Sequence, residues 1–458
     1  MLLTHATLVT WDDQRRILPD HALLIRDGVI AEMGPTRQLL PRYPNEPRLD
    51  ARGQWAMPGH IVAHTHFYGA FARGMAIPGA APKAFPEILQ RLWWPLDQAL
   101  DAEAVRLSAE IMLVDAIRNG VTTLFDHHAS PNALTGSLDV IAEAVRRAGV
   151  RGVLAYEVTD RYGKAKARES IAENVRFAQS VREEDDYRTP RQRLAATFGL
   201  HASLSLDDDT LDAARNACPS DIGFHIHAAE HQADQDDSLT RTGLRVVERL
   251  HRHGILGERS IVAHAVAVDA REIVLLAETG TWVTHQPRSN MNNAVGAARV
   301  EEMLRLGVRV GLGTDGFPHA MWEEARFAYL LPKLSARDPR RMDGNTVMRL
   351  LIENNRRLAN LYFPAARLGV LAPGAAADII LVDFHPHTPV TPDNLPWHLI
   401  FGAYERMITT TIAAGQVLMR DRELLTLSEE RIAAEARAKA PAVWAAYQRI
   451  LQNQGAAP

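Results

Sequence analysis

Hydrophobic and polar positions follow two different patterns along this chain. Near both ends, in residues 1–56, 377–384 and 407–419, short runs alternate apolar and polar residues, and tight turns such as Asp27-Gly28 and Gly415-Gln416 separate them. Such alternation predicts β hairpins. Between about residues 59 and 365, apolar strand-like runs alternate instead with longer helix-like segments, which is typical of a parallel α/β sheet. The pattern therefore predicts one α/β region flanked by two β-rich ends.

The α/β region contains eight apolar runs that predict strands. These runs cover residues 60–66, 122–128, 152–157, 193–201, 222–227, 260–265, 281–286 and 308–315. Eight strand–helix units are what a (β/α)8 TIM barrel needs, so we predict a barrel over residues 59–365. The residues after Gly69 form a long first loop that carries Trp93 and Trp94, a candidate lid.

The two β-rich ends are predicted to form one discontinuous domain, because chain termini often lie close together. Residues 1–58 and 366–458 would make a composite β-sandwich domain with a C-terminal helix, which we expect to be broken near Pro441.

Histidine and carboxylate residues stand at the end of every predicted strand. They are His64, His66, Asp126, His127, Glu157, His201, His227, His264, His285 and Asp315. The carboxyl ends of barrel strands form the catalytic face, and residues i and i+2 of a strand share one face. His64 and His66 can therefore converge on one point, and two neutral imidazoles suit a cation such as zinc. The pattern predicts a metal site.

Composition narrows the class of protein. The chain has 458 residues, a net charge of −4 and one cysteine, Cys218. This charge gives no reason to expect nucleic acid or an anionic membrane as partner, and one cysteine excludes an intrachain disulfide or a thiolate cluster. The first residues do not resemble a signal peptide, and no apolar run reaches the length of a membrane span. We expect a soluble cytoplasmic protein.

Several motifs together resemble a known family. PGHIVAHTH, GLHASLS, HIHAAEH, VAH, HQPRSNMNN and LGTDG are similar to signature segments of the amidohydrolase superfamily, in its cytosine/guanine deaminase and triazine hydrolase branch. LWWPLD, DHHASP, YEVTDR and RSNMNNAVG resemble more narrowly the aminohydrolase family called SsnA. The resemblance spans essentially the whole chain and implies a barrel with a split β domain.

The resemblance also implies a ligand set. In this branch one divalent ion is held by residues that match His64, His66, His227 and Asp315. His227 is preferred to His225 because it stands three residues before Glu230, as in the family motif His-x-x-Glu, and His225 is expected to be a hydrogen-bonded core histidine. The fourth strand ends in His201 without the lysine of two-metal relatives. We expect one ion per chain, zinc first, although Fe²⁺ or Mn²⁺ also suits such ligands.

The chemistry implied by the resemblance is hydrolytic deamination of a planar N-heterocycle that is purine-, pyrimidine- or triazine-like. A divalent metal lowers the pKa of bound water to about 7, so hydroxide is available at neutral pH. Asp315 would accept the proton of the attacking water, Glu230 would act as general acid, and His264 would hydrogen-bond the nucleophile. In an alternative reaction, the same site would hydrolyse a cyclic amide or displace a leaving group other than an amine. A scaffold with an inactive barrel is disfavoured, because the catalytic positions are intact.

Candidate substrate contacts come from the resemblance for His201 and from position and residue type for the others. They are His201, Arg288, Asn290, Trp93 and His128. His127 and His128 alternate faces, so at most one of them points into the barrel mouth. Glu157 or Asp160 is either a pocket carboxylate or a partner of Arg161. Homodimers are common in the family, and we expect one here that acts on a small heterocyclic substrate.

Overall fold

The computed structural model describes residues 1–455, and strands from both chain ends share one nine-stranded sheet. Its N-terminal strands are β1 (Leu2–Val9), β2 (Ile17–Arg26), β3 (Val29–Pro35), β4 (Arg48–Asp50) and β5 (Trp55–Pro58). Its C-terminal strands are β15 (Ile379–Val382), β16 (Ile408–Ala413), β17 (Gln416–Arg420) and β18 (Glu423–Leu424). The two groups join where β5 pairs antiparallel with β15, with Met57 opposite Ile380.

Alternation in these strands explains which side is buried. Leu3, Leu23, Ala56, Ile379 and Ile412 belong to one buried apolar cluster on the sheet, as the period of two requires. The predicted turn at Asp27-Gly28 is present, and both residues have positive φ, as a two-residue hairpin needs. The second turn lies at Ala414-Gly415, one residue earlier than predicted.

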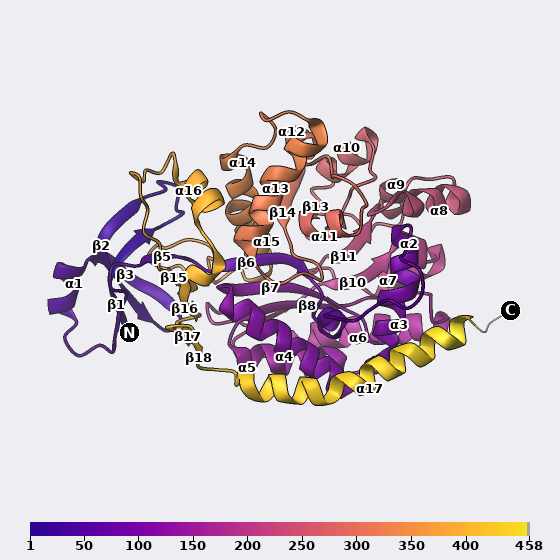
Figure 1. Ribbon diagram of the computed structural model, residues 1–458, viewed down its shortest axis with the longest axis horizontal. Helices are drawn as coiled ribbons and strands as arrows, with labels where there is room; N and C mark the ends of the chain where they lie inside the picture. Colours follow the sequence, from indigo (N-terminus) through magenta and orange to yellow (C-terminus); the bar gives the residue numbers. More distant parts are fainter. Residues whose placement is uncertain (456–458) are drawn as a thin grey trace.

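The central region contains the eight predicted parallel strands, in the predicted order, divided between two sheets (Figure 1). One sheet contains β6 (His60–Thr65), β7 (Val121–His128), β8 (Arg151–Tyr156) and β9 (Leu194–Ala196). The other contains β10 (Phe198–Ala202), β11 (Phe224–Ala228), β12 (Ile261–His264), β13 (Trp282–His285) and β14 (Arg309–Leu312). The predicted fourth strand is split into β9 and β10. Single bridges, Val158–Leu200 and Thr65–Asp315, join the two sheets at both seams.

Helices alternate with these strands. They are α4 (Ala102–Arg118), α5 (Ser137–Ala148), α6 (Lys164–Arg182), α7 (Asp208–Ala217), α8 (Gln232–Thr242), α9 (Val246–Arg252), α10 (Ala270–Glu278), α11 (Pro287–Asn292), α12 (Val300–Arg305), α13 (Met321–Ala336), α14 (Gly344–Met348) and α15 (Asn355–Tyr362). α4 illustrates how the sequence sets both ends of a helix. At its start the Asp101 side chain caps the first turn, and after its end Gly120 adopts a φ of +73°.

The first loop after β6 folds into short helical pieces over the strand ends. It comprises η1 (Phe67–Ala72), α2 (Phe85–Ile88), η2 (Leu89–Trp93) and α3 (Trp94–Ala99). Shorter elements elsewhere are α1 (Thr36–Arg42), η3 (Ser203–Ser205), η4 (Arg349–Asn354), α16 (Leu395–Gly402) and η5 (Glu405–Met407).

The C-terminal helix α17 (Glu429–Gly455) is continuous through Pro441, which corrects the predicted break. A proline removes one helical hydrogen bond, but contacts of α17 with α3 and α4 hold the helix on both sides of it. Trp444 Nε1 donates to Phe71 O at 3.0 Å, and Tyr447 Oη donates to Arg91 O at 2.5 Å. In Figure 1 this yellow helix runs beneath α4 and α3, so the chain end supports the first loop.

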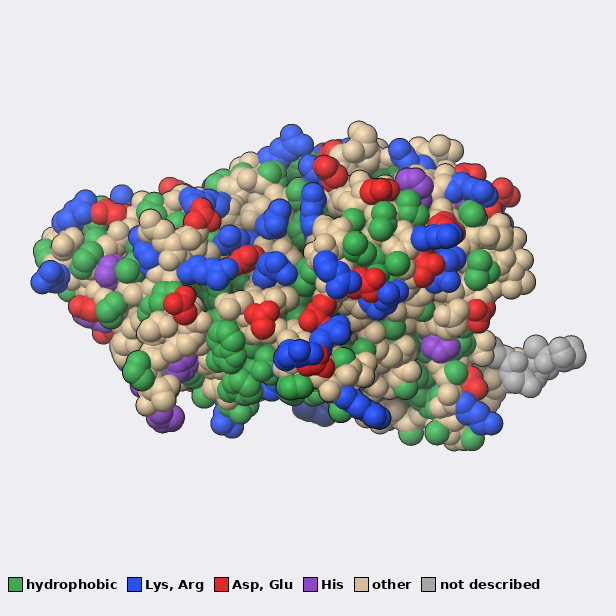
Figure 2. Space-filling model, turned by 90° about the horizontal axis from the view of Figure 1, so that it is seen from above, with side chains coloured by type: hydrophobic (Ala, Val, Ile, Leu, Met, Phe, Trp, Pro, Cys, Tyr) green, Lys and Arg blue, Asp and Glu red, His purple; other side chains and the backbone are tan. Residues whose placement is uncertain are grey.

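The distribution of charged side chains on the surface is consistent with the small net charge. On the face in Figure 2, basic and acidic side chains are intermixed over most of the area. Among residues 1–455, no helix combines the length and apolar character needed to cross a membrane.

Candidate metal centre and pocket

The strand ends bring the predicted ligand residues together. Asp315 Oδ1 lies 3.0 Å from His66 Nε2 and 3.6 Å from His64 Nε2. His66 Nε2 in turn lies 3.1 Å from His227 Nε2. The ligand atoms of His64, His227, His264 and Asp315 all lie within 4.8 Å of one another, so this buried cluster can hold a metal ion.

The geometry of the cluster fits a divalent cation. Ligand atoms about 2.0–2.1 Å from a tetrahedral zinc lie roughly 3.3 Å apart, which matches the separations of 3.0–3.6 Å. The Nε2 atoms of His64 and His264 are buried and have no hydrogen-bond partner among residues 1–455. A cation would satisfy such a set of facing lone pairs, whereas neutral imidazoles and a carboxylate alone leave them unpaired.

A second set of contacts orients the ligand rings. His66 Nδ1 donates to His127 O at 2.6 Å, and His227 Nδ1 donates to His201 O at 2.8 Å. His64 Nδ1 shares a hydrogen bond of 2.9 Å with His225 Nε2. With the proton on Nδ1, each ring turns its Nε2 lone pair toward the centre. His225 is thus the hydrogen-bonded core histidine that the sequence indicated.

The buried carboxylate of Glu157 lies among three histidines of this centre. Its carboxylate lies 3.2 Å from His127 Nδ1, 3.6 Å from His66 Nδ1 and 4.0 Å from His201 Nε2. Burial opposes its ionisation, yet these histidines hold the pKa of Glu157 well below its usual range. The expected pairing with Arg161 is absent among the described residues, because Arg161 pairs with Asp97.

Backbone geometry at the strand ends is unusual. His264 and Asp315 have φ of 73° and 53°, in the left-handed region that residues with a side chain seldom adopt. A Cβ at Gly313 would lie 2.7 Å from His64 O, so only glycine allows β14 to approach β6 this closely. Such backbone strain is common at functional sites, where it holds a side chain in one fixed orientation.

Two residues that the sequence did not single out complete the site. Ser289 Oγ donates to Asp315 Oδ2. Asn293 Nδ2 lies 3.4 Å from Glu230 Oε1 and 3.3 Å from Ser289 Oγ. Both belong to the RSNMNN segment, on α11 and just after it, so their proximity to Arg288 and Asn290 was the available signal.

The two acidic groups of the site have opposite electrostatic environments. Burial raises the pKa of Glu230 to about 7, and the nearby Asp315 carboxylate adds to this. Burial also opposes ionisation of Asp315, but the neighbouring imidazoles of His64 and His66 hold its pKa well below the usual range. His264 Nε2 lies 3.5 Å from Glu230 Oε2. The site thus holds one carboxyl that is partly protonated near neutral pH and one that is ionised.

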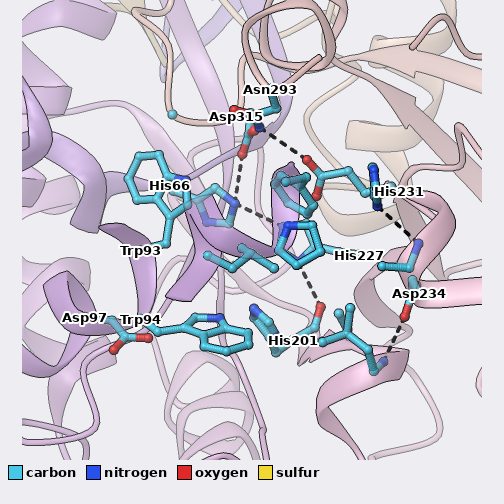
Figure 3. A pocket seen from close by; sticks show the side chains of 18 of the residues that line it. His66, Trp93, Trp94, Asp97, His201, His227, His231, Asp234, Asn293 and Asp315 are labelled. Carbon is cyan, nitrogen blue, oxygen red and sulfur yellow. Dashed lines mark hydrogen bonds and ion pairs between the residues drawn. The ribbon is translucent and has the colours of Figure 1, made fainter. Parts of the chain in front are cut away.

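A pocket opens from the cluster toward the first loop (Figure 3). His66, His227, Glu230, Asn293 and Asp315 line its inner end. Trp93, Trp94 and His201 line its walls, so the structure brings two of the predicted substrate residues, Trp93 and His201, to the pocket. Trp94 lines it too, which the sequence left open.

Three other predicted substrate residues lie outside the pocket lining. Arg288 is held by Glu324, Glu323 (2.6 Å) and Pro318 O (2.7 Å), which occupy its guanidinium. Asn290 Oδ1 hydrogen-bonds His264 Nδ1 at 2.9 Å and therefore orients that ring.

His128 is directed away from the metal centre, with Nε2 2.8 Å from Ser130 Oγ. Of the adjacent pair it is His127 that faces the centre, since its ring centroid lies 4.9 Å from that of His227. The two side chains alternate faces, as expected, and the structure brings His127 rather than His128 toward the histidine cluster.

Comparison with known proteins agrees with this geometry. The profile described as "Amidohydrolase family" matches residues 55–418. The chain is 34% identical to 5-methylthioadenosine/S-adenosylhomocysteine deaminase of Haloarcula marismortui over 392 residues, which cover 84% of this chain and 85% of that protein. It is 29% identical to 5'-deoxyadenosine deaminase of Methanosarcina mazei over 443 residues, covering 95% and 96%. An adenosine deaminase structure from Xanthomonas campestris with bound zinc has a TM-score of 0.82 at 24% identity and covers 99% of this chain and 98% of that one. On the family profile and these relatives, the chain belongs to the amidohydrolase family.

Proposed function

We propose that this protein is a metal-dependent deaminase that hydrolyses an exocyclic C–N bond of a planar N-heterocycle, purine-, pyrimidine- or triazine-like. The observation that carries the proposal is that Glu230 and Asp315, two carboxyl groups with oppositely shifted pKa values, line one pocket beside a histidine cluster. The deaminase names of the relatives and the zinc of the similar structure support it.

The proposed ligands of one divalent ion per chain are His64, His66, His227 and Asp315. We favour zinc because three imidazoles and a carboxylate suit it, and Fe²⁺ or Mn²⁺ would also fit. When bound, the ion supplies a water molecule of lowered pKa.

Different residues of the chain would carry out the individual proton transfers. Asp315, ionised at neutral pH, accepts a proton from the attacking water, while Ser289 holds its second oxygen. Glu230, whose pKa of about 7 keeps much of it protonated, donates to a ring nitrogen and helps to expel ammonia. His264, oriented by Asn290, hydrogen-bonds the nucleophile from the side of Glu230.

The walls of the pocket suit a planar ring. The Trp93 ring lies close to Gly69 in the first loop and to Gly316 after β14, because a Cβ added at either glycine would lie 3.3–3.4 Å from it. With Trp94 it offers aromatic surface on which a heterocycle can stack.

The architecture completes the proposal. We take the two parallel sheets as halves of one (β/α)8 barrel over residues 59–365, joined at the Thr65–Asp315 and Val158–Leu200 bridges. Residues 1–58 and 366–458 would form the satellite β domain, although α17 packs on α3 and α4 rather than on its sheet. A homodimer stays a prediction, to be checked by light scattering.

The proposal is tested by ammonia release. Zinc-loaded protein is incubated with amino-substituted purines, pyrimidines, triazines and nucleosides, and Glu230→Gln protein is the control. Release of ammonia from at least one of them, lost in the variant, is expected. Turnover that frees another leaving group or opens a ring without ammonia would instead favour the alternative chemistry.

A further inference from the structure

The residue between the two histidines of β6 turns its side chain away from the metal centre. Neighbouring side chains of a strand point to opposite faces, so Thr65 faces outward while His64 and His66 face the ligand cluster. Thr65 is fully buried, and its Oγ1 donates to the backbone oxygen of Asp315 at 3.0 Å. A hydroxyl on the outer face of β6 thus holds the main chain of a proposed ligand.

This hydrogen bond lies at the seam between β6 and β14, which the single bridge between Thr65 and Asp315 joins. At the seam the backbone of Asp315 has a φ of 53°, a conformation that residues with a side chain seldom adopt. Its oxygen accepts from Thr65 Oγ1 at 3.0 Å and from His66 N at 3.3 Å. Because these two bonds oppose relaxation of the backbone, they keep the Asp315 carboxylate directed at the ligand cluster.

A buried histidine outside the ligand cluster contacts the Thr65 hydroxyl. His319, in the loop between β14 and α13, has its Nε2 3.1 Å from Thr65 Oγ1 and is fully buried. Its Nδ1 lies 3.1 Å from Oδ2 of Asp115 on α4, and its backbone N donates to the same oxygen at 2.7 Å. Asp115, His319 and Thr65 therefore form a chain of hydrogen bonds that runs from α4 to the backbone of Asp315.

The hydrogen atoms of this chain can be assigned from its acceptors. The Asp315 carbonyl oxygen only accepts, so it takes the single hydrogen of the Thr65 hydroxyl, and His319 Nε2 must donate to Thr65 Oγ1. Burial opposes ionisation of Asp115, but His319 holds its pKa below the usual range, so this carboxylate accepts from Nδ1. Both ring nitrogens thus donate, and charge-assisted hydrogen bonds of this kind are stronger than neutral ones.

We propose that His319 is a positioning residue for the metal centre: anchored by Asp115, it fixes Thr65, and Thr65 fixes Asp315. In the described part of the chain His319 does not line the pocket, so it acts on the ligand and not on the substrate. The assignment rests on the ligand set of the proposed function. Zinc binding by the metal-free protein tests it independently of deamination.

Zinc affinity is the first measurement. Metal-free protein is titrated with Zn²⁺ in competition with a chromophoric chelator. Thr65→Val replaces the hydroxyl by a methyl group and should weaken zinc binding by about 10–100-fold, the scale for lost partners of metal ligands. Thr65→Ser keeps the hydroxyl and should bind zinc as the wild type does.

Thr123→Val is the matched control for this substitution. Thr123 is an equally buried threonine on β7, the strand that pairs with β6, and its Oγ1 has no hydrogen-bond partner among residues 1–455. The same exchange of hydroxyl for methyl should therefore leave zinc affinity unchanged at this position.

The role of His319 is tested by coupling. His319→Gln can still donate one hydrogen bond but carries no charge, so it should weaken zinc binding by about 10-fold, the lower end of the same range. If His319 acts through Thr65, the double variant Thr65→Val/His319→Gln should bind zinc about as weakly as Thr65→Val alone. Losses that multiply in the double variant would show two independent effects and would overturn the chain.

Thermal unfolding separates positioning from general support of the fold. Bound zinc raises Tm according to its affinity, so the difference in Tm between zinc-loaded and metal-free protein falls when zinc binds more weakly. Thr65→Val and His319→Gln should both reduce this difference. A residue that only supports the fold would lower the two Tm values equally, and that result would refute positioning.

The remaining outcomes are distinct. Wild-type zinc affinity in His319→Gln would overturn the assignment even if Thr65→Val failed to fold, and so would an equal loss in Thr123→Val. Weakened zinc binding in the two test variants, together with no ammonia from any heterocycle, would support the positioning role and refute the deaminase function.

Discussion

The hydroxyl of Ser289 donates a hydrogen bond to Oδ2 of Asp315, while Oδ1 of the same carboxylate lies 3.0 Å from His66 Nε2. One oxygen of Asp315 thus belongs to the ligand cluster and the other to a side chain on α11. A carboxylate fixed in this way can serve as ligand and as proton acceptor without rotating.

Ser289→Ala should therefore weaken the enzyme without unfolding it. We expect metal affinity or kcat to fall by about 10–100-fold, as for lost partners of metal ligands. Zinc titration and kcat/KM measure the two effects separately. Met291→Ala, an exposed side chain on the same helix, is the control, and equal losses in both variants would refute a specific role for Ser289.

Metal content is the next expected result. Purified protein should contain about one zinc-like ion per chain, because the two groups of residues that could hold a metal share His64 and His227 and so describe one centre. Chelation should abolish activity, and zinc should restore it, with metal measured by mass spectrometry. A stoichiometry near two, or a modified lysine ligand, would contradict a mononuclear centre.

Glu230→Gln separates acid from ligand. The amide keeps size and polarity but cannot supply the proton, so the variant should retain its metal and lose activity by about 10² or more. Asp315→Asn should lower both metal binding and activity, since it changes a proposed ligand. Metal loss in Glu230→Gln, or retention in His227→Asn, would show that ligand and acid had been exchanged.

The sequence predicted the strands, their order and the convergence of His64, His66, His227 and Asp315, because these depend on periodicity and on which residues end each strand. It could not tell which strand-end residues contribute to the site and which make structural contacts only. Asp126 accepts from Phe67 N at 2.7 Å, and His285 is buried without a partner for either ring nitrogen, yet both stand at strand ends as His227 does.

Arg288 shows a second limit of the sequence. Its guanidinium is occupied by Glu323 and Glu324, which lie 35 and 36 residues further along the chain. Such long-range pairing leaves no local pattern, and the same holds for the pairing of Arg161 with Asp97.

Stability should fall in mild acid because of His60. Burial lowers its pKa from 6.5 to about 4, so the folded state resists a proton that the unfolded chain accepts. The stabilisation is present above pH 6.5 and is lost progressively as the pH falls toward 4. Relative to His60→Leu, the wild type should lose about 2 kcal/mol between pH 7 and pH 5.

The measurement is the free energy of unfolding from denaturant titrations at saturating zinc. His385→Leu, a replacement of a side chain that is 85% exposed, is the matched control. Parallel pH curves for wild type and His60→Leu would disprove this contribution.

Because His66 pairs with Asp315, the site cannot form during protein synthesis until Asp315 has been added to the chain. Roughly 250 residues separate the two, and at about 5–20 residues per second the ribosome needs on the order of 10–50 s to add them. During that interval His64 and His66 lack the carboxylate, and over its first 161 residues they lack His227 as well. The four proposed ligands are therefore complete only after β14 has been synthesised, and a chain truncated before Asp315 would lack one of them.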